Sequence, residues 1–123
     1  MSTRCNIQLF DKFNIDKPGA ILYHHYDGYP PFMKKKLERF LTKINKILCE
    51  NNLHYWWDTE RVSSLMVMLS ANNYENPSLP ESLNQVPTFQ PCQKLHSDIE
   101  YIWNVKLYSK NRNNLFDISY KQV

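Results

Sequence analysis

Glycine is scarce in this chain of 123 residues, which has only Gly19 and Gly28. A P-loop or a dinucleotide-binding G-x-G-x-x-G turn needs several closely spaced glycines, so phosphate cradles of both kinds are excluded. The H-E-x-x-H motif of zinc enzymes is also missing. These absences remove most nucleotide-hydrolase and Rossmann functions. No catalytic residue and no cofactor are predicted, and the sequence favours binding over catalysis.

Cysteines are few and widely separated, at Cys5, Cys49 and Cys92, with no C-x-x-C pair. Neither a zinc site nor a disulfide framework is therefore expected, and free thiols suit a reducing cytosol. The first residues contain no apolar signal-peptide core, and no run reaches the roughly 20 apolar residues of a membrane span. We expect a cytoplasmic protein without membrane contact. The net charge of +3 is low for a nucleic-acid-binding domain.

The hydrophobic pattern predicts one α+β domain over residues 1–123. Alternating polar and apolar residues indicate strands, and apolar residues at i, i+3, i+4 and i+7 indicate amphipathic helices. In chain order we expect two strands, two helices and two strands, within residues 6–10, 20–26, 30–50, 58–71, 99–107 and 116–120. Between the second helix and the third strand, residues 76–95 contain four prolines and predict a long loop with little regular structure.

The order β-β-α-α-β-β predicts a four-stranded, mostly antiparallel sheet with both helices on one face. The other sheet face is then open, and both hairpins present edge strands. Such surfaces favour self-association, so a homo-oligomer is expected. Long loops in small domains tend to be functional, and Phe89 in the proline loop is a candidate apolar anchor.

Residues 23–30 hold the densest cluster of functional side chains. Strand alternation places Tyr23, His25 and Asp27 on one face, where His25 and Asp27 would act together as an oriented base or a binding pair. Tyr29 follows at the expected start of the first helix. The alternative is structural, with the histidine and aspartate bonding to the turn that Asp27 and Gly28 make.

A run of lysines, Lys34, Lys35 and Lys36, is expected in the first turn of the first long helix, and Arg39 follows on its polar face. Cations there oppose the helix dipole, at a cost of about 0.3–1 kcal/mol each. Such a run indicates contact with an anion, either a phosphate or an acidic surface. The alternative is a solvated surface, with Glu38 four residues from Lys34.

Two adjacent indoles, Trp56 and Trp57, occupy the short link between the helices. Neighbouring side chains point in different directions, so one ring is expected to be exposed. Exposed tryptophan is typical of protein interfaces and of base-stacking platforms. The alternative places one ring in the core and the other at its rim.

Three segments resemble a group of small proteins encoded by phages and mobile elements. They are Ser2-Thr3-Arg4 before the first strand, the H-x-D-G-Y-P motif from His25 to Pro30, and an aromatic strand from Ile99 to Trp103. That group has no assigned activity, so the resemblance implies a shared fold and an origin in a phage. Small phage proteins often counter host defences, and this analogy implies action in the host cytosol.

We therefore expect a protein that binds and inhibits a host defence protein or ribonucleoprotein, such as a CRISPR effector. One alternative is a protein that captures or hydrolyses a small phosphorylated or cyclic-nucleotide signal. In that case His25, Asp27, Tyr29 and the lysine run would line an anion-binding pocket. A second alternative is a nucleic-acid-binding module, suggested by interleaved basic and aromatic residues.

Overall fold

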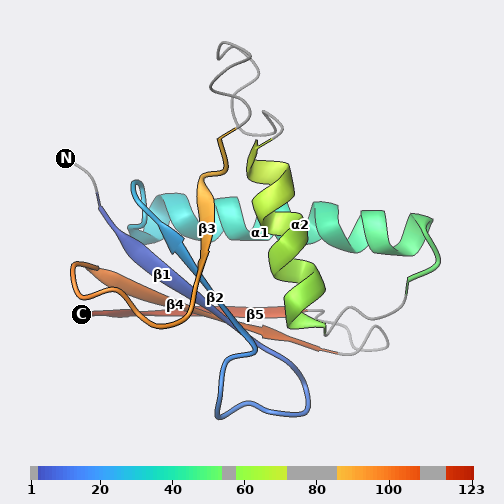
Figure 1. The fold of residues 1–123 in the computed structure, drawn as a ribbon, viewed down its shortest axis with the longest axis horizontal. Coiled ribbons are helices and arrows are strands. Elements are labelled where there is room, and N and C mark those ends of the chain that lie inside the picture. Colours follow the sequence, from blue (N-terminus) through green and yellow to red (C-terminus); the bar gives the residue numbers. More distant parts are fainter. Residues whose placement is uncertain (1–2, 54–57, 72–85, 109–115) are drawn as a thin grey trace.

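The computed structural model describes residues 3–53, 58–71, 86–108 and 116–123. In this part of the chain, two helices pack on a five-stranded mixed sheet of order β3-β2-β1-β4-β5 (Figure 1). The elements are β1 (Cys5–Phe10), β2 (Ala20–His24), α1 (Pro30–Glu50), α2 (Thr59–Ala71), β3 (Phe89–Cys92), β4 (Tyr101–Leu107) and β5 (Phe116–Gln122). The predicted α+β class is confirmed. Neither helix is long and apolar enough to cross a membrane.

Both predicted hairpins form, because β1 pairs antiparallel with β2 and β4 pairs antiparallel with β5. The helix limits also follow the local signals. Pro30 and Pro31 occupy the first turn of α1, and Asn52 stops the helix in a left-handed conformation with φ of 58°. Asp58 caps α2 by accepting a hydrogen bond from the Arg61 N–H at 3.2 Å.

The sheet departs from the prediction in two respects. Residues 89–92, expected within the proline loop, form a fifth strand that pairs with β2. Proline is tolerated there because β3 is an edge strand, where Pro91 need not donate to a neighbour. In addition, β1 pairs parallel with β4, so the sheet is mixed. The two-helix connection makes this possible, because parallel neighbours need a long crossover.

One face of the sheet carries the core. Strand alternation and register put Cys5, Ile7 and Leu9 on the same face as Leu22 and Trp103. All five belong to one buried cluster with Phe40 and Leu41 of α1 and Val62 and Met66 of α2. Both helices therefore cover this face, as predicted, and α2 crosses α1 in Figure 1.

Gly28 fixes the connection between β2 and α1 to the middle of the sheet. Its N–H donates to the Thr3 carbonyl at 2.9 Å, and its carbonyl accepts from the Trp103 indole at 2.8 Å. A Cβ on Gly28 would lie 2.7 Å from Cys5 Cβ and 2.9 Å from the Thr3 carbonyl oxygen. Only glycine fits this close approach, which sets where α1 begins.

We predict that Gly28→Ala lowers the free energy of unfolding by about 1–3 kcal/mol, the usual cost of forcing an extra carbon into a packed interior. The Thr3 backbone cannot rotate away as a side chain would. Urea denaturation measures the change, with Ser64→Ala on the exposed face of α2 as the control. Equal stability of Gly28→Ala and the native chain would contradict this account.

Candidate functional site

A hollow of about 550 Å³ opens where the β2–α1 connection meets the first turns of α1. Its wall combines two aromatic rings, three cations and one carboxylate. The lining residues are Tyr26, Asp27, Pro31, Phe32, Lys35, Lys36 and Arg39. A hollow with this lining suits an anion that also carries a flat, apolar part.

The helical repeat explains why α1 supplies most of this wall. Phe32, Lys35, Lys36 and Arg39 stand at i, i+3, i+4 and i+7, so they share one side of the helix. Phe32 is 56% exposed, and Lys35 and Arg39 are also exposed. Their charged and aromatic groups are therefore accessible to a ligand.

Lys36 is the exception, because it is only 8% exposed. Its ammonium donates hydrogen bonds to His24 Nε2 and to Thr88 Oγ1, the second at 3.3 Å. The same ammonium lies 4.7 Å from the ring centroid of Phe89 and 5.8 Å from those of Tyr26 and Phe40. A buried cation needs such partners, and here hydrogen bonds and cation–π contacts provide them.

His24 is wholly buried, and its pKa falls from 6.5 to about 3. Burial is the main cause, and the positive charge of Lys36 adds to it, while the Tyr26 backbone acts in the opposite direction. The ring is therefore neutral at physiological pH. Because Nε2 accepts from Lys36, the ring proton belongs on Nδ1.

The start of α1 offers few backbone donors to an anion. Pro30 and Pro31 lack an N–H, and the N–H groups of Phe32 and Met33 both donate to the Tyr29 carbonyl. Anion contacts must therefore come from side chains. The placing of the lysine run in the first turn is wrong. Pro30, Pro31, Phe32 and Met33 make that turn and Lys34, Lys35 and Lys36 follow it, so the dipole penalty is smaller than predicted.

The structure brings together only some of the predicted site residues. Four of them line the hollow: Asp27, Lys35, Lys36 and Arg39. Three others do not line it: His25, Tyr29 and Lys34. Tyr29 borders it through Phe32, with ring centroids 5.3 Å apart. Trp56 and Trp57 lie outside the described residues.

The expected partnership of His25 and Asp27 is replaced by two separate environments. β2 ends at His24, so strand alternation does not extend to Asp27, which adopts a left-handed conformation with φ of 54°. Asp27 then lines the hollow, whereas His25 Nδ1 lies 3.1 Å from the Tyr23 hydroxyl. This turn geometry corresponds to the structural alternative for Asp27.

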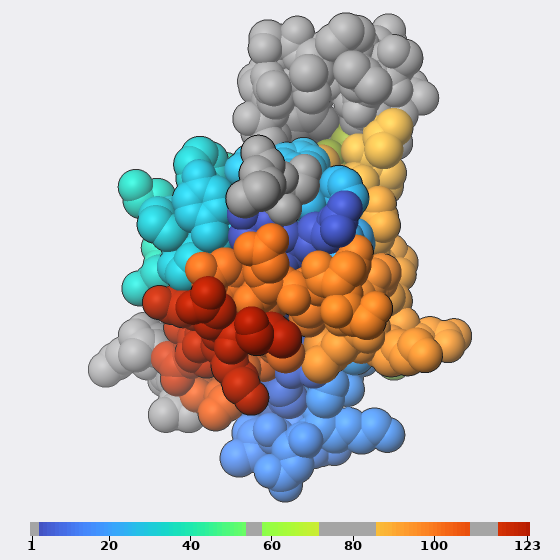
Figure 2. All heavy atoms as spheres, turned by 90° about the vertical axis from the view of Figure 1, so that its left-hand side faces the viewer, coloured from blue at the N-terminus to red at the C-terminus, as the bar shows by residue number. Residues whose placement is uncertain are grey.

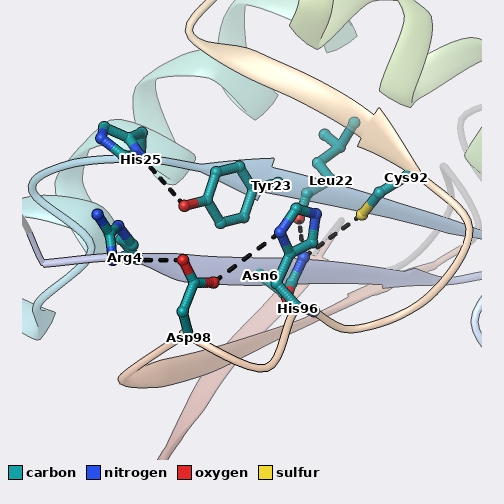
Figure 3. A network of polar contacts seen from close by, with 8 residues as sticks. All are labelled: Arg4, Asn6, Leu22, Tyr23, His25, Cys92, His96 and Asp98. Carbon is teal, nitrogen blue, oxygen red and sulfur yellow. Dashed lines mark hydrogen bonds and ion pairs between the residues drawn. The ribbon is translucent and has the colours of Figure 1, made fainter.

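His25 belongs to a polar network on the sheet face opposite the helices (Figure 3). Burial raises the pKa of Tyr23, as does the charge of Asp98, so the hydroxyl that hydrogen-bonds with His25 Nδ1 keeps its proton. The Tyr23 ring stacks on His96 with centroids 4.0 Å apart. Asp98 in turn contacts Arg4 at 3.3 Å.

Asn6 anchors the same network and is wholly buried. Its amide donates to the Leu22 carbonyl at 3.0 Å, and its oxygen accepts from the His96 N–H at 2.8 Å. The segment between β3 and β4 is thereby held against β1 and β2, and it covers part of the face expected to be open. The network holds the segment between β3 and β4 in place, and the described residues contain no group of three or more possible metal ligands.

Phe89 is also reassigned. The sequence predicts an apolar anchor in the proline loop, but Phe89 is 0% exposed and packs edge-on against Phe40, with centroids 5.2 Å apart. It is therefore a core residue. Its ring makes a cation–π contact with the Lys36 ammonium and is not available as an anchor for a partner protein.

The sequence pattern does not identify the aromatic part of the hollow, Tyr26 and Phe32. For Phe32 a signal is present, because it precedes Lys35, Lys36 and Arg39 at helical spacing on the same side. His24 is also missed. Its neighbour His25 looks equally functional in the sequence, and only burial distinguishes the two rings.

We predict that His24 makes stability depend on pH. The unfolded chain protonates this ring below its ordinary pKa of about 6.5, whereas the folded chain does so only near a pKa of about 3. Between these values the unfolded state binds more protons, so stability is complete above pH 6.5 and falls on acidification. His24 alone contributes a slope of up to about 1.4 kcal/mol per pH unit.

Urea unfolding at pH 7, 6, 5 and 4 measures this slope. Carboxylates titrate in the same range, so the informative quantity is the difference between the native chain and His24→Gln, which keeps an acceptor for Lys36. The variant should lose less stability between pH 7 and pH 4. Identical pH profiles of the two chains would contradict the assignment of a neutral, buried His24.

Comparison with known proteins does not show a family for this chain. No protein family, no curated protein and no solved structure significantly matches the chain.

Proposed function

We propose that this protein binds a small phosphate-bearing ligand with a planar ring in the hollow at the start of α1. One observation carries the proposal: three cations and two aromatic rings converge on one hollow of about 550 Å³. That volume lies within the roughly 300–1,000 Å³ of small-molecule sites. The proposal corresponds to the phosphorylated-signal alternative of the sequence analysis.

The exposed and the buried cations would contribute to anion binding in different ways. Arg39 and Lys35 are exposed, so they can reorient towards phosphate oxygens, and a guanidinium offers two parallel donors. Lys36 is already ordered by His24 and Thr88, so its charge adds attraction without further loss of side-chain freedom. Since His24 stays neutral, it does not add a second buried charge beside Lys36.

The rings and the carboxylate would select among anions. Tyr26 and Phe32 are 41% and 56% exposed, so each can contact a base or another flat group. Asp27 accepts hydrogen bonds and repels phosphate, which favours a ligand with a donor, such as a sugar hydroxyl, on that side. No side chain of the hollow is placed as a nucleophile, and we propose capture instead of turnover.

We predict that ADP binds more tightly than either pyrophosphate or adenosine, because only ADP uses both the cations and the rings. Isothermal titration calorimetry at about 50 mM salt measures the three affinities, with screening kept low. Arg39→Ala should weaken ADP binding about tenfold or more, since a hydrogen bond to a charged group contributes about 1.5–3 kcal/mol. Lys35→Ala should act in the same direction.

Lys17→Ala is the matched control, because it removes an exposed cation from the β1–β2 loop, away from the hollow. It should leave the ADP affinity unchanged. Absence of binding by ADP and pyrophosphate at millimolar concentration would refute the proposal. If Lys17→Ala and Arg39→Ala lose the same ADP affinity, the binding is nonspecific electrostatic attraction and the hollow is not the site.

A shallower groove favours nucleic acid as the second candidate ligand. It continues from the hollow along α1 and is lined by Lys35, Glu38, Arg39, Thr42, Lys43 and Lys46. Such a stripe suits a phosphodiester backbone. If the backbone occupies this groove, the double variant Lys43→Ala with Lys46→Ala should weaken binding of a single-stranded oligonucleotide. The same variant should leave the affinity for ADP unchanged.

Inhibition of a host defence complex stays a prediction based on the resemblance to phage proteins. The exposed cations of α1 support it, because they would face an acidic or ribonucleoprotein surface. A phage that expresses the native chain should then form more plaques on a defended host than one expressing Lys35→Glu with Arg39→Glu. Equal plaque numbers for native, variant and empty control phages would contradict it.

A further inference from the structure

We propose that two copies of this chain join through β5, in antiparallel register about Ser119, so that the two sheets become continuous. This inference is independent of the proposed ligand. It rests on the backbone of β5, on the difference between the two sheet edges and on the charges that the register brings together.

β5 is the last strand of the sheet, and its outer edge meets no other strand of the described chain. It has seven residues and no proline, whereas the opposite edge strand, β3, has four residues and contains Pro91. Short strands and proline protect an edge from pairing. The β3 edge is thus protected, and the β5 edge is open. Figure 2 shows the C-terminal residues (red) at the surface beside β4 (orange).

The hydrogen-bonding direction along β5 follows from its end. The Val123 N–H donates to the Glu100 carbonyl at 2.8 Å, on the β4 side. Backbone groups alternate in direction along a strand, so Ser119 and Lys121 also face β4. The N–H and C=O groups of Ile118 and Tyr120 consequently face outward, where a second strand can pair with them.

A two-fold axis at Ser119 uses these groups in full. Ile118 then pairs with Tyr120 of the second copy, so the outward backbone groups of both residues can form hydrogen bonds across the axis. Tyr120 is 52% exposed in the single chain, and part of its ring would be covered by the apolar side chain of Ile118.

Charge favours this register, because only an axis at Ser119 sets Asp117 directly across from Lys121. Asp117 and Lys121 stand on the sheet face opposite the helices, and with the axis at Ser119 each lies directly across from the other in the second copy. An axis at Asp117 would oppose two aspartates, and an axis at Lys121 would oppose two lysines. Asp117 also faces Lys106 of its own chain and accepts from Tyr108 at 2.6 Å, so it is already oriented on this face.

Sedimentation equilibrium of the native chain tests the proposal. We expect a dimer of twice the 14.8 kDa chain mass, and a monomer at about 100 μM would overturn the proposal. Lys121→Asp should raise the dissociation constant at least tenfold, because it opposes two aspartates across each pair. Asp117→Lys should do the same. Combining both changes restores opposite charges, so the double variant should dimerise more tightly than Asp117→Lys alone.

A cross-link tests the register independently of charge. Residues opposite each other at a position without backbone bonds have Cα atoms about 4.5 Å apart, which a disulfide can span. Ser119→Cys should therefore form a disulfide between the substituted positions of the two copies. The mass of the linked peptides identifies this bond, so that the native cysteines are not mistaken for it. Gln122→Cys is the matched control and should not link to itself. A dimer that shows neither charge rescue nor this cross-link would refute the β5 interface.

Discussion

The close approach of Gly28 to the centre of the sheet is the constraint on which the rest of the structure depends. Its two backbone hydrogen bonds reach Thr3 before β1 and Trp103 in β4, so three distant parts of the chain meet at one residue. The connection that follows β2 is thereby fixed in place. Tyr26 and Asp27 come to lie against the start of α1, and the hollow forms between them.

The buried lysine is the second determinant of the site. Lys36 remains inside because a neutral histidine, a hydroxyl and aromatic rings surround its ammonium. Protonation of His24 would place two positive charges together in a medium of low polarity, so each group constrains the other. The neutral His24 and the buried Lys36 form one unit, which gives the hollow a fixed positive charge and links it to the protein's stability.

The two faces of the mixed sheet differ in what they support. One face supports the helices and the hollow. The other carries Asn6 and Tyr23, which hold the segment before β4 through backbone bonding and ring stacking. His25 lies on this second face, where its Nδ1 is 3.1 Å from the Tyr23 hydroxyl. The two edges differ as well, because Pro91 protects β3 and no proline protects β5.

The sequence by itself determined the elements whose signals are local. The α1 helix could be predicted from the prolines at its start, the asparagines at its end and the apolar repeat between them. The alternation of polar and apolar residues was sufficient to predict both hairpins. β3 was not predicted, because a segment of four residues that includes a proline shows no hydrophobic periodicity. It is a strand because it pairs with β2. The parallel contact of β1 with β4 likewise joins residues nearly a hundred positions apart.

Tertiary structure alone decided which of the candidate residues line one hollow. In the sequence Lys34, Lys35 and Lys36 are alike, yet two are exposed and the third is buried, because successive helical residues point about 100° apart. His24 and His25 differ as well, because His24 ends β2 facing the core, whereas His25 follows the strand and lies with Tyr23 on the opposite face. Residue type thus indicated candidate anion-binding side chains, and the packing of α1 on the sheet determines which of them line the hollow.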